Sequence, residues 1–469
     1  MKILVENIYL SLSLAQTVFI GLGFWAPSTL NGYKKYIFHA YTFVSYIFLN
    51  GSYIIIQVGY LCKVWGNVPL MTGAIFLLFT NLALSVKIFN VYRKKKAIQA
   101  MIAENDCVLY RGKGNIVLSY CRNNRETKIQ LYIYSALSYA AVGGWAISAD
   151  KGELPLKAWY PYDATKSPAY ELTYAHQILA LSLAACLNIF LDNLVTSLIS
   201  QCQCRFNLLS LSLRTLCNGL TGLVSPEAEP LLTLRLHRCI KQHQAILNQA
   251  ALLQSFFSIP VFGQFSVSMV IICVTAYQMA LVNESLIWFI SMLAYIIVML
   301  MQVFLYCYHG NQLVTESGKV AGAAYESPWY MCRPAQRRYL LLVMVRAQRE
   351  TRLKAGNFTE LSLATFMAVS SQCPGAIQSV WHYCSYHSVV YVCPNVPCLT
   401  RRIMIVNLKQ SQINCRLLNT RLFFTPYCKR KSTLFQRVHR THRYLLLLRI
   451  SRSIIIMCSY FTRQTRYFI

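Results

Sequence analysis

The feature that most constrains this chain is a run of 56 residues, Leu252–Cys307, that contains one charged side chain, Glu284. As a single α-helix this run would reach roughly 84 Å, more than twice the thickness of the hydrocarbon core of a bilayer. The run therefore has to turn back on itself, and Asn283-Glu284 is the polar break where we expect the turn. The sequence thus predicts two membrane-spanning helices joined by a short connection.

Four further apolar blocks precede this run, and each is long enough to cross a bilayer. They are residues 36–62, 68–92, 129–149 and 172–200, and a seventh span would begin at Leu361. Only 13% of the residues are charged, against about 25% in a typical soluble domain. We therefore expect an all-α polytopic membrane protein, a seven-transmembrane helical bundle whose seventh helix is either complete or cut short.

The net charge of +29 could indicate a nucleic-acid-binding protein, but the basic residues lie between the apolar blocks. The segment before the first span and the loops 93–128, 201–251 and 308–360 hold 25 Lys and Arg, whereas the alternate loops hold four. This distribution predicts a cytoplasmic amino terminus and contacts with anionic membrane lipid, and no nucleic-acid partner. Near the inner membrane surface we expect the Lys87 side chain to extend to the interface. Asp192, a carboxylate within an expected span, is either a functional residue or, as we expect, in contact with cytoplasmic water.

Three stretches carry a family resemblance. The outer loop contains Trp159-Tyr160-Pro161, and the sixth span ends with Tyr306-Cys307, followed by Gly310-Asn311. The third stretch runs from residue 324 to residue 366 and leads into the last expected span. Together they resemble the insect odorant receptors over roughly residues 20–370. Gln312 stands where that family usually has Glu, and Glu350 where it usually has Pro.

The resemblance implies a function. Insect odorant receptors are ligand-gated, non-selective cation channels that form heteromeric tetramers with an olfactory co-receptor in the plasma membrane of olfactory sensory neurons. A small volatile odorant enters among the outer halves of the second, third, fourth and sixth spans, and the gate lies along the seventh. The short second cytoplasmic loop of this chain resembles that of a tuning receptor rather than the co-receptor. A gustatory-type receptor and a non-functional product with an aberrant carboxyl terminus are the alternatives.

Five residues are candidates for ligand contact. Tyr139 and Trp145 lie in the third expected span, Phe76 and Phe79 in the outer half of the second, and His176 near the outer end of the fourth. Aromatic side chains suit an apolar odorant pocket, although ordinary helix packing explains each of them as well. Tyr139 is the strongest candidate because it falls in the outer half of its span. The aromatic outer loop is expected to cover the pocket, to pack on the helix ends, or to do both.

The chain divides into five expected segments, none of which carries an enzyme motif, a cofactor site or a metal-binding spacing of Cys and His. They are a cytoplasmic segment 1–35, six transmembrane helices with their loops 36–308, a cytoplasmic anchor-type region 309–360, the start of the seventh helix 361–369, and a tail 370–469. The tail has 15 Lys and Arg and no Asp or Glu, and it does not match the family. We interpret it either as a genuine alternative isoform or as the product of an unspliced or frame-shifted message.

Overall fold

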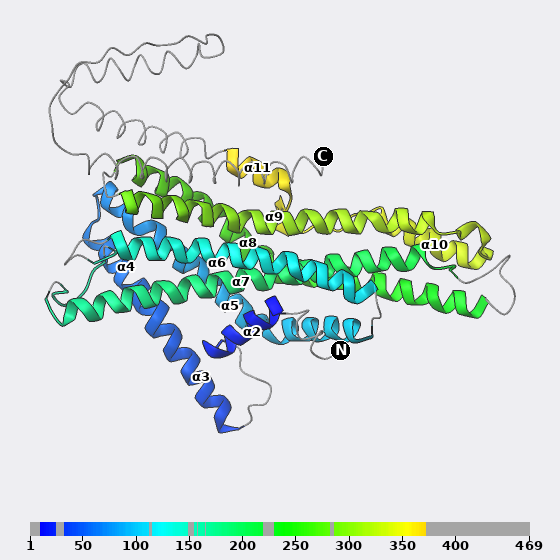
Figure 1. Cartoon of the computed structure of the whole chain (residues 1–469), viewed down its shortest axis with the longest axis horizontal. Coiled ribbons are helices and arrows are strands. Elements are labelled where there is room, and N and C mark those ends of the chain that lie inside the picture. Colours follow the sequence, from blue (N-terminus) through cyan, green and yellow to red (C-terminus); the bar gives the residue numbers. More distant parts are fainter. Residues whose placement is uncertain are drawn as a thin grey trace, which may run out of the picture. The chain divides into compact units, whose positions relative to one another are not determined.

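The computed structural model describes residues 10–24, 32–111, 115–148, 154–156, 158–164, 166–218, 229–281 and 286–371. Expectations about the turn at Asn283-Glu284 and about residues 372–469 lie outside the described residues. The described part of the chain is helical almost throughout (Figure 1), which confirms the all-α fold class. The elements in chain order are α2 (Leu10–Gly21), α3 (Tyr33–Tyr46), the π-helical turn η1 (Ile47–Gly51), α4 (Ser52–Lys63), α5 (Val68–Arg111), α6 (Asn115–Ser148), α7 (Ala169–Arg214), α8 (Glu229–Leu281), α9 (Leu286–Glu326), the 3₁₀ turn η2 (Trp329–Met331), α10 (Pro334–Ala347), β1 (Lys354–Ala355), β2 (Thr359–Glu360) and α11 (Leu363–Ser371).

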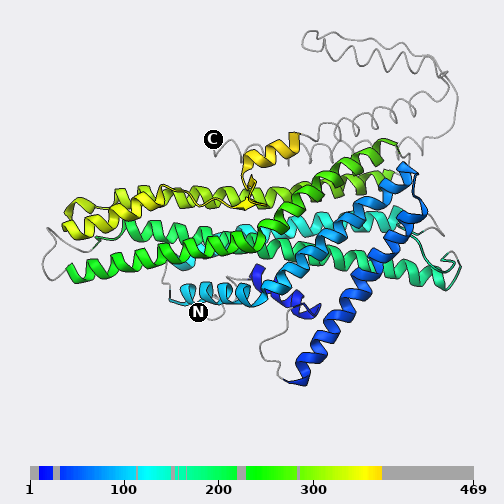
Figure 2. The ribbon, with the colours of Figure 1, turned by 180° about the vertical axis from the view of Figure 1, so that it is seen from behind.

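Helix α7 is the central helix of the described bundle. It packs against α6, α8 and α9, and every residue from Leu191 to Phe206 is buried. Figures 1 and 2 show α6, α7, α8 and α9 running side by side, with α10 lying along one end of α8 and α9. On the amino-terminal side, α2 buries Ala15 and Phe19 against this bundle. A helix surrounded by other helices can hold polar side chains that the bilayer would not tolerate.

Among the described residues, four helices contain a segment long and apolar enough to cross a membrane. They lie within α5, α7, α8 and α9. The blocks expected as the first and third spans are helical too, but neither forms a helix that is both long enough and apolar enough to be counted among these four. The first block is divided into the shorter elements α3, η1 and α4. In α6 the reason is chemical, because Tyr132, Tyr134, Ser135, Ser138 and Tyr139 lower the mean hydropathy of the helix.

A two-stranded hairpin interrupts the helices before α11, and the sequence analysis did not foresee it. Lys354 pairs with Glu360 and Ala355 with Thr359 in antiparallel register. The turn between them places Gly356 and Asn357 at φ values of 60° and 64°, the left-handed region that a type I′ turn requires. Gly and Asn are the residues that adopt this conformation most readily.

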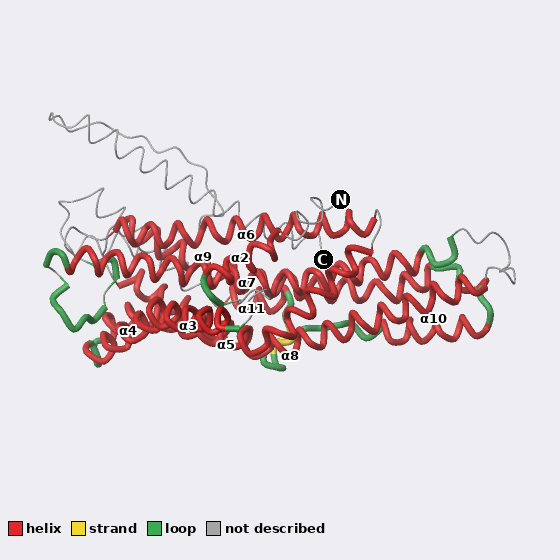
Figure 3. Tube along the Cα trace, turned by 90° about the horizontal axis from the view of Figure 1, so that it is seen from below, coloured by secondary structure: helices red, strands yellow, loops and turns green. Residues whose placement is uncertain are grey.

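The hairpin is attached to α8 by hydrogen bonds. The Gln254 side chain accepts a bond from the Lys354 N–H (2.7 Å) and donates one to its carbonyl (2.9 Å), and the Ser258 hydroxyl donates to the same carbonyl (3.0 Å). Figure 3 shows the two short strands in yellow beside α8. Helix α11 follows directly and packs against α9. The hairpin therefore fixes where α11 starts.

Candidate functional site

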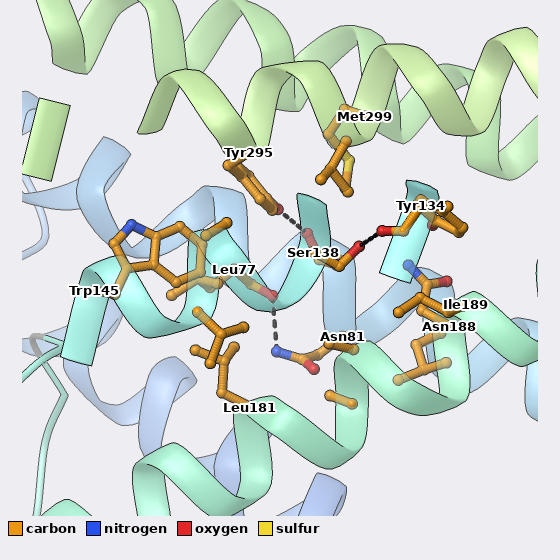
Figure 4. Close-up of a pocket in the computed structure, with 17 residues that line it drawn as sticks. Leu77, Asn81, Tyr134, Ser138, Trp145, Leu181, Asn188, Ile189, Tyr295 and Met299 are labelled. Carbon is orange, nitrogen blue, oxygen red and sulfur yellow. Dashed lines mark hydrogen bonds between the residues drawn. The ribbon is translucent and has the colours of Figure 1, made fainter. Parts of the chain in front are cut away.

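A cavity lies inside the bundle between α5, α6, α7 and α9, toward the carboxyl end of α6 (Figure 4). Its volume is about 60 Å³, several times the ~10–15 Å³ that one water molecule needs on the same measure. Most of its lining is aliphatic or aromatic, with a few hydroxyl and carboxamide groups, which is typical of small-molecule sites. The lining residues are Leu77, Thr80, Asn81, Leu84, Tyr134, Ser138, Ala141, Val142, Trp145, Leu181, Ala184, Ala185, Asn188, Ile189, Tyr295, Val298 and Met299.

Aromatic side chains form one wall of the cavity. The ring centroids of Trp145 on α6 and Tyr295 on α9 are 5.2 Å apart. The Phe76 ring on α5 packs behind them, 6.0 Å from the Trp145 ring and 5.5 Å from the Tyr295 ring. Tilted and edge-on contacts of this kind are favourable for aromatic pairs. Of the candidates from the sequence, Trp145 therefore lines the cavity and Phe76 supports its wall.

The other three candidates lie away from the cavity lining. Tyr139 is 44% exposed and shares an outward face of α6 with Tyr132. Phe79 is half-buried on α5 and does not line the cavity. His176 lies between α7 and the first helices, with Nε2 3.3 Å from the Ser52 hydroxyl and its ring 5.6 Å from the Phe48 ring. Whether any of them contacts a ligand stays a prediction.

Most polar groups on the cavity wall are already hydrogen-bonded to the protein. The hydroxyl groups of Thr80 and Tyr295 are 2.5 Å apart. The Asn81 amide nitrogen donates to the Leu77 carbonyl (2.9 Å), and the Ser138 hydroxyl donates to the carbonyl of Tyr134 (2.8 Å). These bonds allow the hydroxyl and amide groups to be buried without a large desolvation cost.

Below the cavity, one carboxylate joins four helices. Asp192 on α7 accepts hydrogen bonds from Lys87 Nζ on α5 (2.6 Å), the Tyr134 hydroxyl on α6 (3.0 Å) and the Tyr306 hydroxyl on α9 (2.7 Å). Gln302 Nε2, also on α9, donates to Oδ2, the oxygen that also accepts the bond from Tyr134. We call Asp192 and its four partners the Asp192 cluster. Because Tyr134 also lines the cavity, this cluster connects the cavity wall to Tyr306, which lies further along α9 toward its carboxyl end.

The expectations about Lys87 and Asp192 were wrong. Asp192 is 1% exposed, and the Lys87 side chain is 6% exposed and pairs with it instead of reaching the interface. The reason is that α6 and α9 continue alongside α7, so protein rather than water surrounds this level of the bundle. A carboxylate buried inside a helical bundle has to be paired with a positive charge and hydrogen-bonded, and the contacts of Asp192 meet both requirements.

The signature residues near the end of the sixth expected span lie where α9 contacts α7 and α11. Tyr306 binds Asp192, and Cys307 is completely buried. A Cβ atom added at Gly310 would lie 2.4 Å from the backbone oxygen of Leu361, so only glycine permits this close approach. The Asn311 carbonyl accepts a bond from Thr315 within the helix.

The outer-loop signature packs on the ends of the helices. The Trp159 ring covers Gly59 of α4, where an added Cβ would come within 2.8 Å of it. The Tyr160 hydroxyl accepts a bond from Gln177 Nε2 (3.0 Å), while Pro161 is exposed. The structure thus matches the expectation of a loop packed on the helix ends, and a covering role over the cavity stays a prediction.

The sequence did not identify the polar lining residues Thr80, Asn81, Ser138 and Tyr295, although one signal was present. Tyr134, Ser138, Ala141 and Trp145 are spaced by four, three and four residues, so they occupy one face of α6. Starting from Trp145 and following this face would have reached Tyr134 rather than Tyr139.

Comparisons with known proteins identify the family of this chain. The family profile described as 7tm Odorant receptor matches residues 67–373. Odorant receptor 94a of Drosophila melanogaster is 25% identical over 358 residues, which cover 74% of this chain and 90% of that protein. Odorant receptor Or1 of Anopheles gambiae is 22% identical over 375 residues, which cover 74% of this chain and 89% of that protein.

A solved structure shares the fold. The insect olfactory receptor OR5 from Machilis hrabei, in complex with eugenol, aligns with a TM-score of 0.67 at 17% sequence identity. The alignment covers 80% of this chain and 99% of that one.

Proposed function

Since the chain belongs to the 7tm odorant receptor family, whose profile matches residues 67–373, we propose that it is the odorant-binding subunit of a ligand-gated, non-selective cation channel. As a member of that family it is a membrane receptor and not an enzyme. The proposal further assigns it a heteromeric, tetrameric assembly with the olfactory co-receptor, as a tuning receptor in the plasma membrane of olfactory sensory neurons, with its amino terminus in the cytoplasm.

The observation that carries the proposal is the apolar cavity between α5, α6, α7 and α9. Its aromatic wall and few polar groups suit a small volatile molecule that gains affinity mainly from burial. The related receptor from Machilis hrabei is described in complex with eugenol, a ligand of this general kind.

Contacts beyond the cavity suggest how ligand binding in the cavity could change the position of α11. The Asp192 cluster joins the cavity wall to Tyr306 of α9. One turn along the same helix, Gly310 abuts Leu361, and the Phe304 ring lies 5.3 Å from the Phe366 ring of α11. We propose that α11 begins the helix that gates the channel, and that α9 displaces it when a ligand is bound.

Current recording from cells that also express the olfactory co-receptor tests the proposed function. One arm uses the chain as it stands, and the other replaces everything after Val369 with the helix ending of a related receptor. We expect odorant-gated cation current from the second arm and little from the first, because the tail differs from the family where the gating helix should continue. Sequencing of the transcript across codon 370 shows which ending the message encodes.

The control for these recordings is the co-receptor expressed alone. If neither arm conducts in response to a broad odorant panel, although both reach the cell surface, the channel function is refuted. Robust current from the unmodified chain would instead support the tail as a genuine isoform ending.

A further inference from the structure

The Asn188 side chain on α7 lies at the boundary between the cavity and the Asp192 cluster. It is 8% exposed and lines the cavity. Its amide oxygen accepts a hydrogen bond from Lys87 Nζ (2.9 Å) and a longer one from Gln302 Nε2 (3.4 Å). Because a lysine ammonium group can only donate, the amide oxygen has to face Lys87 and the amide nitrogen has to face the other way.

The Asn188 amide nitrogen is a donor without a protein acceptor among the described residues. Figure 4 shows this nitrogen on the side of the amide toward Ser138 and Asn81. The neighbouring donors differ, since Ser138 gives its single hydroxyl hydrogen to a backbone carbonyl and Asn81 gives one of its two amide hydrogens to another. An apolar molecule that fills the cavity would leave this donor unpaired, which is unfavourable by an amount comparable to a hydrogen bond, whereas a bound molecule with an acceptor oxygen would pair with it.

We propose that Asn188 is a specificity-determining residue, which donates a hydrogen bond to the ligand and selects small volatiles with an acceptor oxygen over hydrocarbons of the same shape. This inference rests on the proposed function, in which the cavity is the odorant site. Ketones, esters and alcohols share the required oxygen. An apolar pocket discriminates weakly between ligands of similar shape. A pocket that contains a hydrogen-bond donor binds a ligand without an acceptor oxygen more weakly, because the donor then has no partner.

Binding to the full-length protein in lipid nanodiscs tests this selectivity without requiring the channel to open. The probes are methyl ketones of several chain lengths, including methyl pentyl ketone, each paired with the alkene in which a methylene group replaces the oxygen. Equilibrium dialysis with quantification by gas chromatography gives both dissociation constants. We expect the ketone to bind about three- to ten-fold more tightly than its alkene, the range that one hydrogen bond supplies.

Variants assign the effect to one donor. Asn188→Leu should bring the ketone-to-alkene ratio close to one while the alkene still binds, which also shows that the variant is folded. Asn188→Ala removes the same donor and serves if the leucine variant does not fold. Asn207→Leu, on an exposed part of the same helix, is the matched control and should retain the preference.

The Trp145 indole nitrogen is the competing donor, because it is buried without a partner among the described residues. Trp145→Phe should change the affinities of ketone and alkene by the same factor. A ratio that persists in Asn188→Leu, or that is lost in Trp145→Phe alone, would overturn the inference, as would equal binding of both probes to the unmodified protein. If neither ketone nor alkene binds, the inference about Asn188 fails, whereas the proposed function is decided separately by the current recordings with a broad odorant panel.

Discussion

Lys87 Nζ lies 2.6 Å from Asp192 Oδ1, and the two residues, 105 positions apart in the sequence, form a buried ion pair inside the helical bundle. Two tyrosine hydroxyls and a glutamine amide complete the hydrogen bonding of the carboxylate. Burying an ion pair is costly, but removing one partner of a pair that is already buried is costlier, because the other charge is then uncompensated.

The first prediction concerns this pair. Asp192→Leu should destabilise the protein by about 3–5 kcal/mol, because Lys87 would stay buried without its counter-ion. The double variant Lys87→Met/Asp192→Leu should recover much of that loss. Thermal unfolding of the purified protein in detergent measures both. A double variant no more stable than Asp192→Leu alone would contradict the ion-pair explanation.

The second prediction separates two aromatic candidates on α6. Trp145 lines the cavity, whereas Tyr139 lies on an outward face. Trp145→Ala should therefore weaken odorant potency by about 1–3 kcal/mol, the contribution of one packed aromatic ring, and Tyr139→Ala should leave it nearly unchanged. Dose–response curves at matched surface expression check this, and a larger effect at Tyr139 would favour the interpretation from the sequence.

The third prediction concerns the contact between α9 and α11. Gly310→Ala should destabilise the protein by about 1–3 kcal/mol, because its Cβ would collide with the Leu361 backbone. Gly322→Ala, on the same helix, is the matched control, since an added Cβ meets nothing within 4 Å there. That control should be neutral or stabilising by up to about 1 kcal/mol. Equal melting temperatures for the two variants would show that the contact is not tight.

The fourth prediction concerns orientation. The 25 basic residues in one set of loops, against four in the other, predict a cytoplasmic amino terminus. An epitope tag at Met1 should therefore be stained by antibody only after cells are permeabilised. A tag in the outer loop near Asp163 should be stained in intact cells, and the reverse pattern would invert the topology.

Much of the helical architecture could be predicted from the sequence, because it depends on local composition. The long apolar run had to fold back, and α8 indeed ends at Leu281 before α9 begins at Leu286. The two-residue strands were missed because their signal is only Gly356-Asn357 between charged and polar neighbours.

The site was predictable only in part. Trp145 was identified by its type, but the choice between Trp145 and Tyr139 depends on how α6 is rotated. In a membrane bundle both the inner and the outer faces of a helix are apolar, so periodicity does not reveal the rotation. The pairing of Lys87 with Asp192 was inaccessible for a similar reason, since it depends on the relative depth of two helices.

The sharing of Asp192 among α5, α6, α7 and α9 has a consequence for receptor engineering. A chimera that exchanges α7 alone with that of a receptor lacking this acid would leave the lysine of α5 and the tyrosines of α6 and α9 facing an apolar residue. Transplanting α7 from such a receptor therefore requires the lysine of α5 to be exchanged for an apolar residue at the same time.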